Sequence, residues 1–170
     1  AASEWGGLFS TADAGRNWSY VDGHSAQSTW DVKISPADDD LLVATSFFDG
    51  RTNSQAGINV SRDGGATWAV PTGARPDIAD CWNNARVAEP SAFGIAFDPD
   101  DDNAIYVGTN CGLAISSDAG VTWDFADPTP GDAGGLDVWD VLVHDDSTID
   151  ICGDDGHQRS TDGGATFVQG

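Results

Sequence analysis

The feature that most constrains the fold is an eight-residue motif that occurs four times along the chain. Its pattern is Ser/Thr-x-Asp-x-Gly-x-Thr/Asn-Trp/Phe, and the copies align without gaps at residues 11–18, 61–68, 116–123 and 160–167. The Asp residues of successive copies are 50, 55 and 44 positions apart. A repeat of this length predicts a chain built from copies of one supersecondary unit.

The residue types within the motif predict a tight hairpin loop. The Asp carboxylate accepts backbone N–H groups within the turn, and the Gly supplies a positive φ. The aromatic residue then begins the outgoing strand and is expected to bury about 150–250 Å². The predicted structural residues are Asp13, Asp63, Asp118 and Asp162, with Trp18, Trp68, Trp123 and Phe167.

Short apolar segments precede the motif and predict β-strands. In the third unit these segments are 93–97, 104–108 and 112–115, and the second and fourth units carry equivalents. Of the 28 acidic residues, 26 are Asp, and the chain has 21 Gly. Asp and Gly favour turns rather than helices, so an all-β fold is expected. Each full unit is therefore four strands, A to D, with the motif between C and D.

Four-stranded units that repeat every 40–50 residues or so predict β-propeller blades. We expect one partial propeller domain over residues 1–170. It would hold a half blade with only strands C and D over 4–20, and three full blades over 29–71, 92–126 and 136–169.

The motif resembles the Asp-box, or BNR, repeat of sialidases, sortilin-type receptors, two-propeller xyloglucan hydrolases and many secreted bacterial proteins. The resemblance covers nearly the whole chain, and it implies a propeller in which the boxes lie on the edge away from the ligand-binding face. A ring of six to ten blades needs about 300 residues or more. The remaining blades are therefore expected from the same precursor or from another chain. An open stack whose ends pack on another chain is the alternative.

The three cysteines bear on the cellular location. In blade topology Cys81, in the D–A connection, lies on the same face as Cys111, in the next B–C connection, so a Cys81–Cys111 disulfide is predicted. Two reduced thiols are the alternative. Cys152, which ends a B strand, is expected to be a buried free thiol. The disulfide and the resemblance favour a secreted, cell-surface or periplasmic protein.

The net charge and the spacing of possible metal ligands argue against several functions. A net charge of −21 argues against nucleic acid and anionic lipid as partners, and no apolar run is long enough for a membrane span. The Asp clusters at 38–40 and 98–102 are expected to be solvated A–B turns, with weak Ca²⁺ binding as the alternative. Cysteine and histidine spacing predicts no zinc site, so no cofactor and no other metal is expected.

Ligands of propellers usually bind on the face built by the D–A and B–C loops. The D–A loop over 72–91 carries Trp82, Asn83, Asn84 and Arg86, a mixture of stacking and planar hydrogen-bonding groups that suits sugars. A structured loop with Trp82 packed over the blade is the alternative. Trp30 and Trp139 occupy equivalent positions at the start of strand A, on this same face.

Asp31 and Asp140 follow these two tryptophans and are the candidate catalytic residues, since a carboxylate pair could hydrolyse a glycosidic bond. The alternative role is hydrogen bonding to the backbone of a neighbouring blade. The sialidase signature is missing, because the chain has no Tyr/Phe-Arg-Ile-Pro segment. The favoured function is a non-catalytic, extracellular recognition or structural module that binds carbohydrate or a protein. The alternative is part of a secreted glycoside hydrolase of the Asp-box propeller type.

Overall fold

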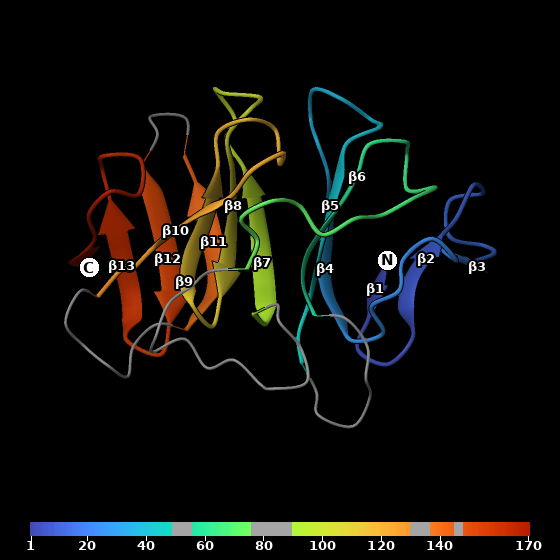
Figure 1. Cartoon of the computed structure of the whole chain (residues 1–170), viewed down its shortest axis with the longest axis horizontal. Coiled ribbons are helices and arrows are strands. Elements are labelled where there is room, and N and C mark those ends of the chain that lie inside the picture. The colour runs from blue at the N-terminus through green and yellow to red at the C-terminus, as the bar shows by residue number, and fades with distance from the viewer. Residues whose placement is uncertain (49–55, 76–89, 130–136, 145–147) are drawn as a thin grey trace.

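The computed structural model describes residues 1–48, 56–75, 90–129, 137–144 and 148–170. Within these residues the chain forms four antiparallel sheets and no helix, and the sheets follow one another in chain order across the molecule (Figure 1). We call them blades 1 to 4. The structure is thus all-β and has the form of a partial propeller, as the repeats predict.

The sheets are built from short strands. Blades 1 and 2 comprise β1 (Ala2–Ser3), β2 (Gly7–Ser10) and β3 (Ser19–Tyr20), then β4 (Thr29–Ile34), β5 (Leu42–Ser46) and β6 (Gly57–Ser61). Blade 3 comprises β7 (Ala92–Phe97), β8 (Ile105–Thr109), β9 (Gly112–Ser116) and β10 (Asp124–Ala126). Blade 4 comprises β11 (Val138–Val143), β12 (Ile149–Gly153), β13 (Gly156–Ser160) and β14 (Val168–Gln169).

Blades 1 and 2 differ from the expected strand count. Blade 1 has a third strand, because Ala2–Ser3 pairs with β2 in the place of strand B. In blade 2 the fourth strand is reduced to a single antiparallel bridge between Val60 and Ala69. The first strands of blades 2, 3 and 4 contact one another in sequence, β4 with β7 and β7 with β11, so they form the inner side of the stack.

The repeated motif forms the same hydrogen-bonded loop in all four blades, and we call these the repeat loops. In the third, Ser116 donates to Asp118 Oδ1 at 2.9 Å, which also accepts the Thr122 N–H at 2.8 Å. The Thr122 hydroxyl donates to Asp118 Oδ2 at 2.6 Å. Gly120 has a φ of 81° and Ala119 one of 57°, so two successive residues lie in the left-handed region, and glycine serves best there.

Adjacent blades pack face to face through apolar side chains. We call the side of a blade that points to the next blade in the chain its forward face, and the other side its rear face. Val43 and Val60 on the forward face of blade 2 pack with Ile95 and Ile105 on the rear face of blade 3. A second core joins blades 3 and 4 and comprises Ala104, Tyr106, Leu113, Val138, Val141, Val143, Ile149 and Ile151.

The aromatic residues of the repeat loops are not all buried as expected. Trp123 is only 3% exposed, because it lies on the rear face of blade 3 within the core shared with blade 2. Trp18 is 50% exposed, since it belongs to blade 1, whose rear face has no blade against it in the structure. Burial of this position thus depends on the preceding blade and not on the loop itself.

The expectation of a buried Cys152 is wrong. Side chains alternate along β12, so that Ile149 and Ile151 face blade 3 while Cys152 points to the forward face of blade 4 and is an exposed free thiol. Cys111 is fully buried in the turn between β8 and β9. Its predicted partner, Cys81, lies outside the described residues, so the disulfide stays a prediction. No helix in the described ranges is long and apolar enough to span a membrane.

Candidate functional site

Aromatic rings from three successive blades meet at one end of the inner strands. Trp30 on β4, Phe93 on β7 and Trp139 on β11 each occupy the second position of the first strand of their blade. The ring centroids are 5.4 Å apart for Trp30 and Phe93, 4.6 Å for Phe93 and Trp139, and 6.4 Å for Trp30 and Trp139. The two tryptophans that the sequence singled out are therefore brought together, with Phe93 between them.

Irregular strand pairing occurs at these three positions. The register of each inner strand shifts between Thr29 and Asp31, between Ala92 and Ile95, and between Val138 and Asp140. A β-bulge leaves one residue out of the ladder and changes the direction of its side chain, and bulges are common beside functional sites. Repetition of the bulge in three blades explains why one ring of each blade points to the same place.

The rings line a hollow of about 550 Å³. Phe93 is 5% exposed and forms its floor, whereas Trp30 and Trp139 are 50% and 37% exposed and present their surfaces to solvent. Phe47 packs edge-on against Trp30, with centroids 5.9 Å apart. Glu4, Thr29 and Ser91 also line the hollow.

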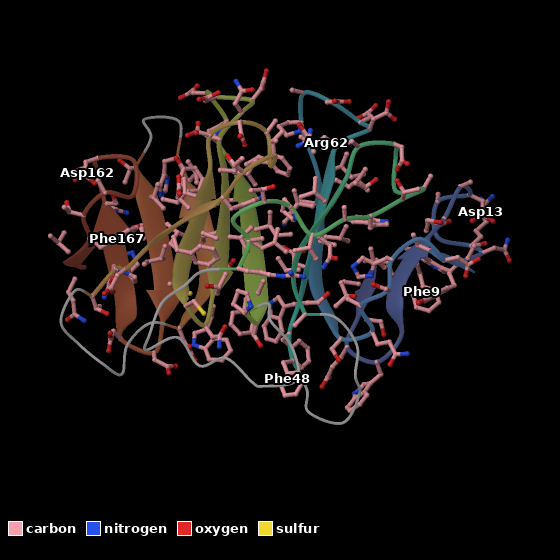
Figure 2. All side chains as sticks on the ribbon, viewed as in Figure 1. Phe9, Asp13, Phe48, Arg62, Asp162 and Phe167 are labelled. Carbon is pink, nitrogen blue, oxygen red and sulfur yellow. The ribbon has the colours of Figure 1, made fainter. Side chains whose placement is uncertain are left out.

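Hydrogen bonds fix parts of the wall. The indole N–H of Trp139 donates to Asp154 Oδ1 at 3.0 Å, which holds the ring in one orientation. Ser91 Oγ accepts the backbone N–H of Phe48 at 2.9 Å. Figure 2 places Phe48 at the end of the molecule opposite to the repeat-loop residues Asp162 and Arg62. The hollow and the repeat loops thus lie at opposite ends of the blades.

The two candidate catalytic carboxylates lie beside the hollow but do not line it. Asp31 Oδ1 accepts the Val32 N–H at 2.8 Å, and Asp140 Oδ1 accepts the Val141 N–H at 3.0 Å. Asp140 packs against Gly94 of blade 3, where a Cβ atom would lie 2.3 Å from Oδ1. Both carboxylates therefore accept a backbone N–H of their own bulged strand, and not of a neighbouring blade.

Other acidic groups near the hollow are Glu4 and the pair Asp137 and Asp154. Among the described residues that line the hollow, Glu4 is the one with a carboxylate side chain. Burial raises the pKa of Asp137, and the neighbouring charge of Asp154 raises it further. Across the described ranges no group of three or more His, Cys, Asp or Glu side chains is arranged to hold a metal ion.

Sequence reasoning named some of these residues and missed others. Trp82, Asn83, Asn84 and Arg86 lie outside the described residues, so their role as ligand-binding groups stays a prediction. Phe93 was missed, although the repeat alignment places it at the same position as Trp30 and Trp139. Phe47 and Phe48 were also missed. Their position directly after β5, where the B–C loop begins, is the feature that could have pointed to them.

Comparison with known proteins shows the fold. No family model and no curated protein matches the chain. Among solved structures, an ancestral GH74 enzyme matches with a TM-score of 0.77 and 17% identity over 99% of this chain and 22% of its own. The GH74 xyloglucanase from Xanthomonas campestris matches with a TM-score of 0.65 and 18% identity, over 99% of this chain and 28% of its own.

A third structure, YCF48 bound to D1 peptide, matches with a TM-score of 0.59 and 15% identity over 85% of this chain and 39% of its own. All three likenesses rest on low sequence identity and therefore establish the propeller fold alone. The chain spans between about a fifth and two fifths of the length of these matched structures.

Proposed function

We propose that this chain is part of a non-catalytic propeller that binds carbohydrate in the aromatic hollow formed by Trp30, Phe93 and Trp139. The observation that carries the proposal is the convergence of one ring from the same bulged position of three successive blades. Trp30 and Trp139 present exposed rings above the buried Phe93, and together they form a platform on which a sugar ring can stack.

The chemistry of the hollow suits sugars. The faces of sugar rings are apolar enough to stack on aromatic rings, while their hydroxyl groups need polar partners at the rim. Trp30 and Trp139 supply exposed ring surface, and Glu4 and Ser91 supply polar side chains. The likeness to GH74 structures, one of them a xyloglucanase, directs attention to xyloglucan.

A glycoside hydrolase of the Asp-box type is the second candidate, favoured by the same GH74 likeness. Hydrolysis needs two carboxyl groups about 5–10 Å apart on either side of the scissile bond. Here Asp31 and Asp140 accept hydrogen bonds from their own strands and do not line the hollow. This arrangement favours binding over catalysis.

Titration with xyloglucan, cellulose and laminarin oligosaccharides tests the proposal. We expect Trp30→Ala and Trp139→Ala each to weaken binding by roughly tenfold or less, since ring stacking contributes about 0.5–1.5 kcal/mol. Trp18→Ala is the matched control, because Trp18 is as exposed as Trp30 but belongs to a repeat loop at the other end of the blades. Binding to none of the sugars, or equal loss in all three variants, would contradict the proposal.

An assay for released reducing sugar separates the two candidates. Turnover that disappears in Asp31→Asn or Asp140→Asn would favour the hydrolase, whereas binding without turnover supports the recognition module. Saturable binding of a peptide but not of a sugar would instead indicate a protein ligand.

The proposal includes further blades and an extracellular or periplasmic setting. The matched structures are longer propellers, which supports completion of the ring by blades from the same precursor or another chain. The repeat loops support the likeness to Asp-box proteins. We also propose the Cys81–Cys111 disulfide, for which thiol counting is the test: one reactive thiol, Cys152, in the unfolded protein without reductant, and three with it.

A further inference from the structure

A small hollow of about 10 Å³ lies at the turn that joins β12 to β13 in blade 4. Ile151, which packs in the core shared with blade 3, and its cross-strand partner Gln158 both line it. Asp137 and Asp155 line it as well, so three oxygen-bearing side chains surround it. We call it the oxygen hollow. Its volume has room for about one water molecule or one ion.

Two oxygen atoms at the oxygen hollow are buried and unpaired. Gln158 is only 5% exposed, and no donor in the described part of the chain reaches its Oε1 atom. Asp155 Oδ2 is buried in the same condition. A buried acceptor without a partner is costly, and more so when it is charged. Two such atoms on one hollow therefore mark a place where a positive or hydrogen-donating group binds.

The equivalent turn of blade 3 shows that the fold does not need these oxygens. Turns 153–156 and 109–112 each pair their first residue with their last. The second residue of each turn donates its N–H to the carbonyl just before the inner strand, at 3.2 Å in blade 4 and 3.1 Å in blade 3. In this alignment Asp137, Asp155 and Gln158 correspond to Ser91, Cys111 and Ala114 of blade 3. Blade 4 thus places carboxylate and amide groups where blade 3 has a fully buried Cys111 and Ala114.

The donor set suits a hard divalent cation. Ca²⁺ binds carboxylate and amide oxygens, takes about six to eight ligands in flexible geometry, and accepts water at the remaining positions. Mg²⁺ demands stricter geometry and keeps several waters, for which a hollow of this size has little room. Two carboxylates match the charge of the ion. Since the third group is an amide, the set is not one of the groups of His, Cys, Asp and Glu that the described ranges lack.

We infer that the oxygen hollow is a Ca²⁺ site whose protein ligands are Asp137, Asp155 and Gln158. The backbone of the turn is held ready for the ion, because Gln169 Nε2 donates to Asp155 O at 2.8 Å and the Asp154 N–H donates to Asp137 O. The ion also steadies Asp154, whose Oδ1 accepts the indole N–H of Trp139. The site thus supports one wall of the aromatic hollow without taking part in stacking.

Calorimetric titration of the metal-free protein with CaCl₂ alone tests the inference. We expect Asp155→Asn and Gln158→Ala each to weaken Ca²⁺ binding by about tenfold or more, because each removes a ligand or a charge. Gln158→Ala copies blade 3, so the turn should still fold. Asp39→Asn, in an exposed Asp-rich turn, is the control for weak binding to the acidic surface and should leave the affinity unchanged. Equal affinities in the wild type and Gln158→Ala would overturn the inference.

Gln158→Glu separates a cation site from an amide that is turned to donate its N–H to Asp155. A third carboxylate at a cation site should lower the melting temperature without calcium and raise Ca²⁺ affinity, so that calcium restores the stability. Saturating Ca²⁺ should raise the melting temperature of the wild type by about 2 °C or more, and that of Gln158→Ala by much less. Loss of stability in Gln158→Glu that calcium does not restore would identify the turned amide and contradict the site.

The indole N–H signal of Trp139 in nuclear magnetic resonance reports on the link to Asp154. It should shift as calcium saturates the wild type and stay in place in Gln158→Ala, whereas an unmoved signal in the wild type would contradict this link. All of these measurements are made without sugar, so their failure and the failure of sugar binding are distinguishable.

Discussion

At the scale of single residues, one carboxylate organises each repeat loop. Hydrogen bonds from the Thr122 hydroxyl and N–H lower the pKa of Asp118 to about 2, and those from Thr166 lower the pKa of Asp162 to about 2. The pKa values of Asp13 and Asp63 are lowered in the same way. The charged form of each Asp is thus favoured by folding, so these loops add stability only where the carboxylate is ionised.

The first prediction concerns this dependence on pH. Asp118→Asn removes the charge while keeping the shape, and we expect it to lower the free energy of unfolding. A group whose folded pKa is depressed contributes stability above its unfolded pKa of about 3.8 and loses it as pH falls through the folded value. The difference in unfolding free energy between the wild type and Asp118→Asn, measured with urea, should be largest above pH 4 and should shrink toward pH 2. Asp124→Asn on exposed β10 is the control, and an equal effect of both substitutions would contradict the account.

His24 titrates in a different range. Burial lowers its pKa to about 4, and its ring packs edge-on against Trp68 with centroids 5.1 Å apart. A histidine that is neutral when folded destabilises the protein as the unfolded chain takes up a proton below its pKa of about 6.5. The loss is complete near pH 4.

The second prediction follows from this burial. Unfolding free energy should fall by up to about 3 kcal/mol more in the wild type than in His24→Leu as pH drops from 7 to 4. The comparison of the two proteins cancels the effect of the many carboxylates, which titrate in both. Parallel pH profiles for wild type and variant would show that His24 is not held neutral in the fold.

At the scale of elements, the blades share one backbone design but differ at their faces. Three positions on the forward face are Val43, Ile58 and Val60 in blade 2, and Tyr106, Leu113 and Ile115 in blade 3. The equivalent positions in blade 4 are Asp150, His157 and Arg159. Arg159 binds both oxygens of Asp150 at 2.7 Å, and His144 and His157 each approach one of them at 2.8 Å. The forward face of blade 4 therefore suits water or a polar partner.

The third prediction exchanges these side chains. A variant with Asp150→Tyr, His157→Leu and Arg159→Ile reproduces the forward face of blade 3 on blade 4. An exposed apolar sheet face promotes association, so sedimentation should show more self-association in the triple variant than in the wild type. The control makes one change, His157→Gln, which keeps the face polar. Identical sedimentation of all three proteins would contradict the role given to these residues.

Strands and repeat loops could be predicted from the sequence because they depend on local patterns. The alternation of apolar residues and the Asp-Gly turn chemistry each act within a few residues. The bulges at Trp30, Phe93 and Trp139 have no such local signal, since a bulge is a property of two paired strands. The exposure of Trp18 and Cys152 likewise depends on which blade faces they lie on.

At the scale of the whole molecule, four blades in a row place their inner strands side by side and bring equivalent residues together. The repeat alone predicted that Trp30 and Trp139 lie on one face. It did not predict their distance, because that depends on how blade 3 inserts Phe93 between them. The likeness to much longer propellers supports the proposal that this hollow is one sector of a larger surface.

The central claim is that sugar binds on these rings, and indole N–H signals in nuclear magnetic resonance test it most directly. Each signal can be assigned by a Trp→Phe substitution and followed as oligosaccharide is added. We predict that the signals of Trp30 and Trp139 shift and saturate together, while those of the repeat-loop residues Trp18 and Trp123 stay in place. Unchanged Trp30 and Trp139 signals at saturating sugar, or shifts confined to Trp18, would contradict it.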